Sequence, residues 1–159
     1  MTGACGQARR GFLRRRDPGL FTPGPIVDTN GGQLGTHAGV AAYTVGQRKG
    51  LGLASAAPLY VVDIDADRNR VIVGAPAALE RDRLVATEVN FIACDTPREP
   101  LRVQARIRHG HRPAPATVQV RADGAAEVVF DEPQRAITPG QSVVWYRDDL
   151  VVGGGVISR

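Results

Sequence analysis

The sequence predicts a mainly β protein in which a small annex of hairpins and loops precedes an antiparallel β-barrel. Short runs rich in Val, Ile and Leu are separated by turn residues at regular intervals, which is typical of closed all-β domains. Residues 101–108 alternate between apolar and polar side chains, the period of a strand with one buried face. Because no stretch keeps a helical period beyond about two turns, long helices are not expected.

Residues 1–21 are predicted to form a basic arm or a short helix. Five arginines surround Gly-Phe-Leu in this region, and a helix here would break at Pro18. A frayed arm is the alternative, because few apolar residues are available to anchor the segment.

Residues 22–58 are predicted to form the annex. Asn30-Gly31 lies between two short apolar runs, which is the strongest local signal for a β-hairpin. Further on, residues 43–52 place three glycines around Gln-Arg-Lys, which includes the only lysine of the chain. This stretch is either a solvated basic turn or a shaped backbone that presents Arg48 and Lys49 to an anionic partner. The pattern alone favours the turn.

Residues 59–159 are predicted to form the barrel. Turns at 66–69, 123–124 and 147–149 join pairs of β-rich runs, and residues 83–92 form a further strand. Gly153-Gly154-Gly155 lies inside a β run and indicates a bulge or close backbone packing. Asp131-Glu132 is interpreted as part of a turn before Ile137 rather than as an acid–base pair, because neighbours in a strand face opposite ways.

The densest cationic segment begins on the polar face of the alternating strand. Arg106 and Arg108 share that face, and His109, His111 and Arg112 follow in the loop. A row of arginines can hold a phosphate backbone, and it can equally be a solvated strand face. The sequence pattern alone favours neither of these two interpretations.

Composition limits the class of protein to which the chain can belong. The hydrophobic fraction of 43% allows a real core, and a net charge of +4 mildly favours an anionic partner. Cys5 and Cys94 are too far apart in sequence to suggest a zinc or disulfide motif, so no metal is expected. Cys94 is expected to be a small packing residue. No apolar run approaches the length of a membrane span, so a cytoplasmic protein without a membrane partner is expected.

Several segments together, in this order, resemble the tRNA-specific 2-thiouridylase family: residues 23–28, 35–39, 43–52, 59–62, 105–108, 128–142 and 153–157. The resemblance extends over nearly all of residues 12–157. It implies an enzyme that adenylates the wobble uridine (U34) of tRNA with ATP and then delivers sulfur from a cysteine persulfide. It also implies that 22–58 is part of the family's central domain and that 59–159 is its C-terminal barrel, of the translation-factor or aminomethyltransferase type.

The resemblance places ATP and Mg²⁺ in an N-terminal PP-loop pyrophosphatase domain, whose Ser-Gly-Gly-x-Asp-Ser loop is absent from this sequence, so no cofactor is expected in this chain. Arg108 and Gln141 match tRNA contacts of the family, and His109 replaces a Tyr beside Arg108. Arg106 joins them on the same strand. The resemblance also implies that residues 43–52 form a junction between annex and barrel, where Arg48 and Lys49 face either RNA or the catalytic domain. If they face the catalytic domain, the segment is expected to be mobile and exposed in this chain.

Cys5, in Thr2-Gly3-Ala4-Cys5, resembles the start of the family segment whose cysteine carries the persulfide. Gly6 replaces the following Phe, and the spacing to Phe12 is three residues shorter than in the family. Nearby arginines would lower the thiol pKa, whereas an ordinary thiol on a mobile end is the alternative.

Three hypotheses follow for the function. The chain is a tRNA-binding module whose catalysis needs a separate PP-loop pyrophosphatase chain. Alternatively, it is one subunit of a split enzyme in which Cys5 takes sulfur from a cysteine desulfurase or a sulfur relay protein. The third hypothesis is a non-catalytic remnant barrel. In none of these is the chain catalytically self-sufficient.

Overall fold

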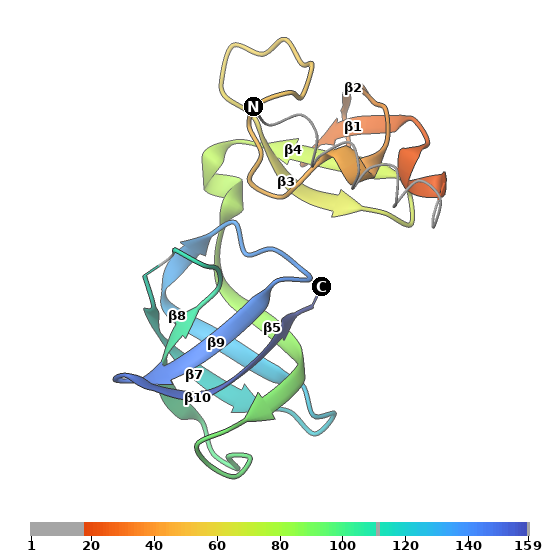
Figure 1. Ribbon diagram of the computed structural model, residues 1–159. Helices are drawn as coiled ribbons and strands as arrows, with labels where there is room; N and C mark the ends of the chain where they lie inside the picture. Colours follow the sequence, from red (N-terminus) through yellow and green to blue (C-terminus); the bar gives the residue numbers. More distant parts are fainter. Residues whose placement is uncertain (1–17, 111, 159) are drawn as a thin grey trace, which may run out of the picture. The chain divides into compact units, whose positions relative to one another are not determined.

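The computed structural model describes residues 18–110 and 112–158, and these form two compact units that meet in sequence at Leu79 and Glu80 (Figure 1). Most of the predicted arm, residues 1–17, lies outside the described residues. The arm's described end is a short 3-10 helix, η1 (Pro18–Phe21). None of the helices among the described residues is long and apolar enough to cross a membrane.

The first unit is a four-stranded sheet with the strand order β2-β1-β4-β3. Its strands are β1 (Gly24–Asp28), β2 (Gln33–His37), β3 (Tyr60–Asp65) and β4 (Arg70–Gly74). The predicted hairpin at Asn30-Gly31 is confirmed: Gly31 has φ 89°, and Asp28 caps the turn by accepting hydrogen bonds from the amides of Asn30 and Gly32. The predicted hairpin at 66–69 is also confirmed and joins β3 to β4.

The position of β1 was not predicted, because it depends on a parallel pairing between segments far apart in sequence. Ile26 of β1 lies in register with Val71 of β4, and both side chains are fully buried. Four further buried side chains complete this core: Val73 of β4, Val61 of β3, Val40 of η2 (Val40–Ala42) and Leu51. Burial of these side chains is the main favourable term that joins the annex to the β3–β4 hairpin.

The domain boundary therefore differs from the predicted one. The predicted barrel starts at residue 59, whereas β3 and β4 belong to the sheet of the first unit and the second unit begins at Glu80. A β-rich hairpin followed by more strands looks like part of the same barrel. Only its pairing with β1 shows which core it joins.

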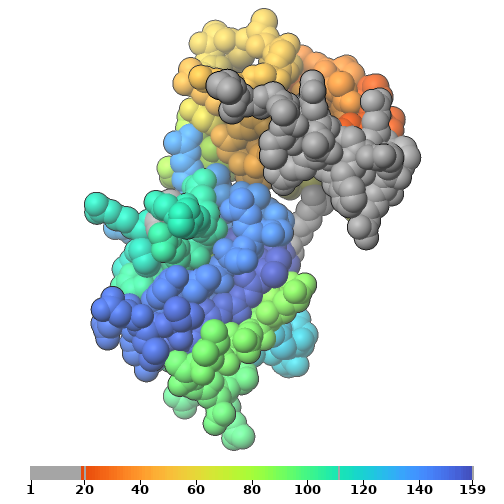
Figure 2. All heavy atoms as spheres, in the orientation of Figure 1, coloured from red at the N-terminus to blue at the C-terminus, as the bar shows by residue number. Residues whose placement is uncertain are grey.

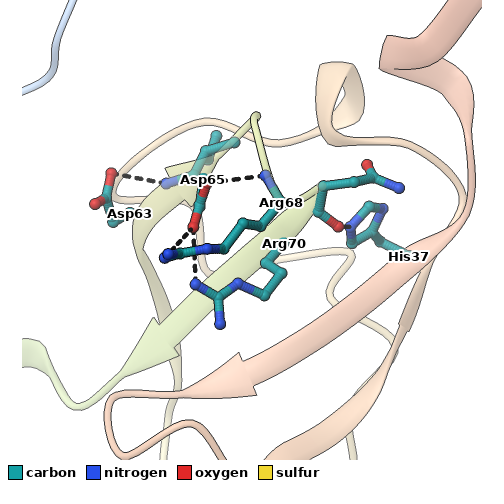
Figure 3. Close-up of polar contacts among 7 residues, drawn as sticks. His37, Asp63, Asp65, Arg68 and Arg70 are labelled. Carbon is teal, nitrogen blue, oxygen red and sulfur yellow. Dashed lines mark hydrogen bonds and ion pairs between the residues drawn. The ribbon is translucent and has the colours of Figure 1, made fainter.

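The turn between β3 and β4 is held by a small polar network, shown in Figure 3. Asp65 accepts a hydrogen bond from Nη2 of Arg70 at 2.8 Å and another from the backbone amide of Arg68 at 3.1 Å. These hydrogen bonds, Arg70 first, lower the pKa of Asp65, because they favour its charged form.

His37 links β2 to the same turn. Its Nδ1 accepts a hydrogen bond from the amide of Gly39 at 3.0 Å, so its Nε2 carries the proton and donates to the carbonyl of Asn69, also at 3.0 Å (Figure 3). The Asn69 side chain in turn donates to the carbonyls of Thr22 and Pro23. His37 is only 2% exposed and is a structural residue that fastens the end of β2 to the β3–β4 turn, while Asn69 fastens the residues just before β1 to the same turn.

The second unit is a closed barrel of six antiparallel strands in the order β10-β5-β8-β7-β6-β9, which confirms the predicted fold class (Figure 1). After η3 (Pro76–Leu79) the strands are β5 (Glu80–Phe91), β6 (Leu101–Arg106), β7 (Ala114–Val120), β8 (Ala126–Arg135), β9 (Ser142–Arg147) and β10 (Leu150–Ile157). The predicted turns at 123–124 and 147–149 join β7 to β8 and β9 to β10.

The barrel interior is filled by apolar side chains from every strand. The predicted alternation is confirmed in β6 and just beyond it: Val103, Ala105 and, after the strand, Ile107 are buried, while Arg102 and Gln104 are exposed. The largest interior side chain is Trp145 of β9, which is fully buried and packs against Phe91 with ring centroids 5.1 Å apart. A packed interior of this kind leaves the outer surface and the two ends of the barrel for binding.

The glycine run of β10 confirms the prediction of a bulge and close packing. The register of β10 shifts between Gly154 and Val156 where it pairs with β5, and between Val151 and Gly153 where it pairs with β9. A Cβ on Gly154 would lie 2.6 Å from the carbonyl oxygen of Val143, and one on Gly155 would lie 2.7 Å from that of Thr87. Neighbouring backbone therefore occupies the space that a side chain needs.

Candidate functional site

One end of the barrel gathers the cationic residues that the sequence singled out. In this antiparallel barrel, β6, β8 and β10 end where β5, β7 and β9 begin. The β6–β7 loop (107–113) and the β8–β9 loop (136–141) therefore lie at the same end. In Figure 2 the teal atoms of the β6–β7 loop stand out from the barrel surface. We call this end the arginine rim, made up of Arg106, Arg108, His109, Arg112, Arg135 and Gln141.

Arg108 is the best-positioned residue of the rim. Its Nη2 donates a hydrogen bond to the backbone carbonyl of Arg135 at the end of β8, at a distance of 2.8 Å. This bond crosses from the β6–β7 loop to β8 and uses only one of the N–H donors of the guanidinium. The side chain remains exposed, so the bond orients the charge without neutralising it.

Arg106 is a rim residue with a buried hydrogen-bond donor that lacks an acceptor among the described residues. It lies opposite Val144 of β9, and its side chain is half-buried. Among the described residues its Nε is buried and has no hydrogen-bond partner. A buried donor without an acceptor carries an energetic cost, so an anionic ligand at the rim would be stabilised by supplying one.

Backbone hydrogen bonds fix the position of Gln141, and its side chain is exposed to solvent. Its carbonyl accepts a hydrogen bond from Ile157 at 2.8 Å, and Gly140 donates to the carbonyl of Ile157, also at 2.8 Å. These bonds fasten the β8–β9 loop to the end of β10. The side chains of Gln141 and His109 are both exposed.

The outer face of the barrel carries less net positive charge than the sequence suggests. Arg102 makes two hydrogen bonds of 2.7 Å with Asp131 of β8 and a third, of 3.1 Å, with Thr117 of β7. Hydrogen bonding between the two charged groups lowers the pKa of Asp131 and raises that of Arg102. Our assignment of Asp131 to a turn is wrong, because β8 continues to Arg135 and the carboxylate pairs across strands.

Arg48 and Lys49 belong to the first unit. Gln47 shapes their turn: its Oε1 accepts from the amide of Thr44 at 3.1 Å, and its Nε2 donates to the carbonyl of Lys49 at 3.0 Å. The glycines at 46, 50 and 52 have φ of 88°, 76° and 66°, values that favour glycine. Both cationic side chains are exposed.

The prediction that residues 43–52 join the annex to the barrel is wrong. The segment pairs with β3 inside the first unit: Gly46 donates to the carbonyl of Val61 at 2.8 Å, and Val61 donates to that of Gln47 at 2.9 Å. Leu51 is buried in the same core. The segment therefore belongs to the first unit and is bonded to the edge of β3, rather than connecting the two units.

The structure tests the prediction for only one of the two cysteines. Cys5 lies outside the described residues, so its role as a sulfur carrier stays a prediction. Cys94 is exposed, and the prediction that it packs in the core is wrong. The reason is that β5 ends at Phe91, which places Cys94 in the β5–β6 loop rather than in the strand.

Sequence reasoning did not single out Arg135 as a member of the rim. Its role depends on the hydrogen bond between its carbonyl and Arg108, a contact between residues 27 positions apart that no local pattern reveals. Arg112 was visible as part of the cationic segment, and it is exposed in the β6–β7 loop. A carboxylate lies beside the rim, because Glu80 of β5 is in cross-strand register with Arg135.

Two family models match the chain, and their boundaries follow the two units. Residues 10–75 match the tRNA methyl transferase PRC-barrel domain. Residues 81–157 match the aminomethyltransferase β-barrel domain. The protein thus combines a small PRC-type β domain with an aminomethyltransferase-type barrel.

Similar curated proteins that match more than nine tenths of this chain are named tRNA-specific 2-thiouridylases. The chain is 53% identical over 146 residues to the enzyme MnmA of Acetivibrio thermocellus, which is 92% of this chain and 41% of the relative. It is 46% identical to MnmA of Clostridioides difficile and 45% identical to that of Desulforamulus reducens, over 93% and 94% of this chain and 41% of each relative. The chain belongs to the tRNA-specific 2-thiouridylase family and spans about two fifths of the length of these relatives.

Proposed function

We propose that this chain is the tRNA-binding portion of a tRNA 2-thiouridylase and serves the 2-thiolation of the wobble uridine. Its family and the names of its relatives support tRNA as the ligand. The observation that carries the proposal is the arginine rim, where Arg108 is oriented by the Arg135 carbonyl and the neighbouring Nε of Arg106 has no acceptor among the described residues. Phosphate oxygens are the acceptors that such a group of guanidiniums fits best.

In this proposal the rim holds RNA by charge, and exposed polar side chains refine the contact. Arg106, Arg108 and Arg112 face phosphates, while His109 and Gln141 can stack on or hydrogen-bond to unpaired nucleotides. ATP, Mg²⁺ and the adenylation chemistry belong to residues outside this sequence. The role of the chain is to hold the substrate in position.

The test measures binding of unmodified tRNA to the chain by fluorescence anisotropy over a range of salt concentrations. Arg108→Ala is expected to weaken binding by about 3- to 10-fold and to lower the slope of log K against log salt by about 0.9, the loss of one phosphate contact. Arg121→Ala is the matched control. It removes the same charge from an exposed side chain in the β7–β8 turn, at the opposite end of the barrel.

Binding that falls equally in Arg121→Ala and Arg108→Ala would show that only net charge matters, and it would refute the assignment to the rim. A wild-type chain that binds no tRNA even at low salt would refute the proposed function as a whole.

A further inference from the structure

The loop that follows Gln47 in the first unit is an anchored loop with a cleft of its own. Its two ends are joined by the backbone hydrogen bonds between Gly46, Gln47 and Val61, with distances of 2.8 and 2.9 Å. Leu51 fixes its middle by being buried in the core, and Leu53 packs over Gly35, where a Cβ would come within 2.6 Å of it. The loop projects from the sheet in Figure 1, drawn in yellow, but its conformation is set from within.

The cleft enclosed by this loop has a volume of about 230 Å³, well above what one water molecule needs. It is lined by Arg48, Ser55 and the backbone around Gly50 and Gly52, with Pro58 and Leu59 closing one side. A Cβ on Gly52 would meet nothing within 4 Å, so packing does not require glycine there. Its φ of 66° favours glycine, and this angle sets the direction of the neighbouring amides.

The loop that lines the cleft has hydrogen-bond donors without protein acceptors. Among the described residues, no backbone amide from Arg48 to Leu59 donates to a protein acceptor, and the guanidinium of Arg48 makes no ion pair. Loops in which backbone amides and a cation converge without their own acceptors are typical anion-binding sites.

No carboxylate in the surrounding sequence opposes this charge. Residues 29–62 contain no Asp or Glu, although Arg48 and Lys49 lie in the middle of that run. Lys49 is adjacent in sequence, but its side chain does not line the cleft. The geometry therefore assigns different roles to two neighbouring cations that look equivalent in the sequence.

We propose that the cleft of residues 48–59 is a phosphate-binding site, in which Arg48, the Ser55 hydroxyl and backbone amides around Gly50 and Gly52 hold one phosphate group. This site shares no residue with the arginine rim and does not depend on the RNA-binding role of the rim. The phosphate group belongs either to the sugar–phosphate backbone of a bound RNA or to a free phosphate compound such as pyrophosphate.

The experiment is an NMR titration of the isotope-labelled chain with pyrophosphate, followed through its backbone amide signals. Saturable shifts are expected at the amides of Gly50, Gly52 and Ser55. Arg48→Ala should weaken this binding by at least about tenfold, since a hydrogen bond to a charged group is lost. Lys49→Ala is the matched control, and it should change the affinity by less than about threefold, because it removes an equal charge that does not line the cleft.

Gly52→Ala is a second variant, which changes no charge. It should also weaken pyrophosphate binding, because alanine disfavours the left-handed backbone that orients the amides. Shifts that do not saturate, or equal losses in Lys49→Ala and Arg48→Ala, would overturn the proposal, because the anion would then respond to net charge alone.

A competition arm separates the two sources of the phosphate group. If tRNA displaces pyrophosphate from the Gly50 and Gly52 amides of the Arg108→Ala variant as well as of the wild type, the ligand is an RNA phosphate. If pyrophosphate binds with the expected dependence on Arg48 and tRNA leaves it in place, the ligand is a free phosphate compound. Failure of tRNA binding at the rim does not affect the pyrophosphate titration, so the two proposals fail separately.

Discussion

Substitution of Gly154 by alanine tests the close approach of β10 to β9, and two opposing effects decide its sign. Gly154 does not have a positive φ, so alanine can adopt its backbone angles. The reduced freedom of the unfolded chain would then stabilise the variant by about 0.4–1 kcal/mol. Against this, the new Cβ would lie 2.6 Å from the Val143 carbonyl oxygen, whose backbone is paired in the ladder. Such overpacking costs about 1–3 kcal/mol.

The steric effect is larger, so Gly154→Ala is expected to destabilise the barrel by about 1–2 kcal/mol. With an unfolding slope of about 2 kcal/mol per molar urea, the midpoint falls by about 0.5–1 M. Trp145 is the only tryptophan and is fully buried in the barrel, so its fluorescence reports the unfolding of this unit.

Ser142→Ala is the control for this measurement. Ser142 is exposed at the start of β9, where it pairs with Val156, and its loss should change stability by less than about 0.5 kcal/mol. A Gly154→Ala variant as stable as the wild type, or more stable, would refute the argument that backbone proximity requires glycine at this position.

Two further predictions concern polar contacts. His37→Ala should destabilise the first unit by about 2–4 kcal/mol, because the Gly39 amide and the Asn69 carbonyl lose their partner, and faster hydrogen exchange at the β1 and β4 amides would reveal it; unchanged protection would contradict it. Arg102 lowers the pKa of Asp131 in the folded state, so this stabilisation is present above the ordinary carboxylate pKa and lost as pH falls through the folded value. Asp131→Asn should therefore lower the urea midpoint more at about pH 7 than at about pH 2, and an equal loss at both pH values would count against the pair.

The sequence was sufficient to predict the strands and most of the turns. Alternation such as that of residues 101–108 reflects the two faces of a single strand, and the Asn30-Gly31 turn needs only local backbone preferences. The family was likewise recognisable, because many segments resemble it and occur in the same order along the chain. The cationic segment around Arg108 could be named, but not the carbonyl that orients it.

Sequence by itself thus determined a β-rich chain, its hairpins, its family and a set of candidate cations. Tertiary structure decided which core each hairpin joins, because the pairing of β1 with β4 and the closure of β10 against β5 bring together residues far apart in the chain. It also separated Arg48, which lines a cleft, from Lys49, which does not. Local patterns record the preference of each segment for a conformation, whereas hydrogen bonds and packing between distant segments decide which donors remain available for a ligand.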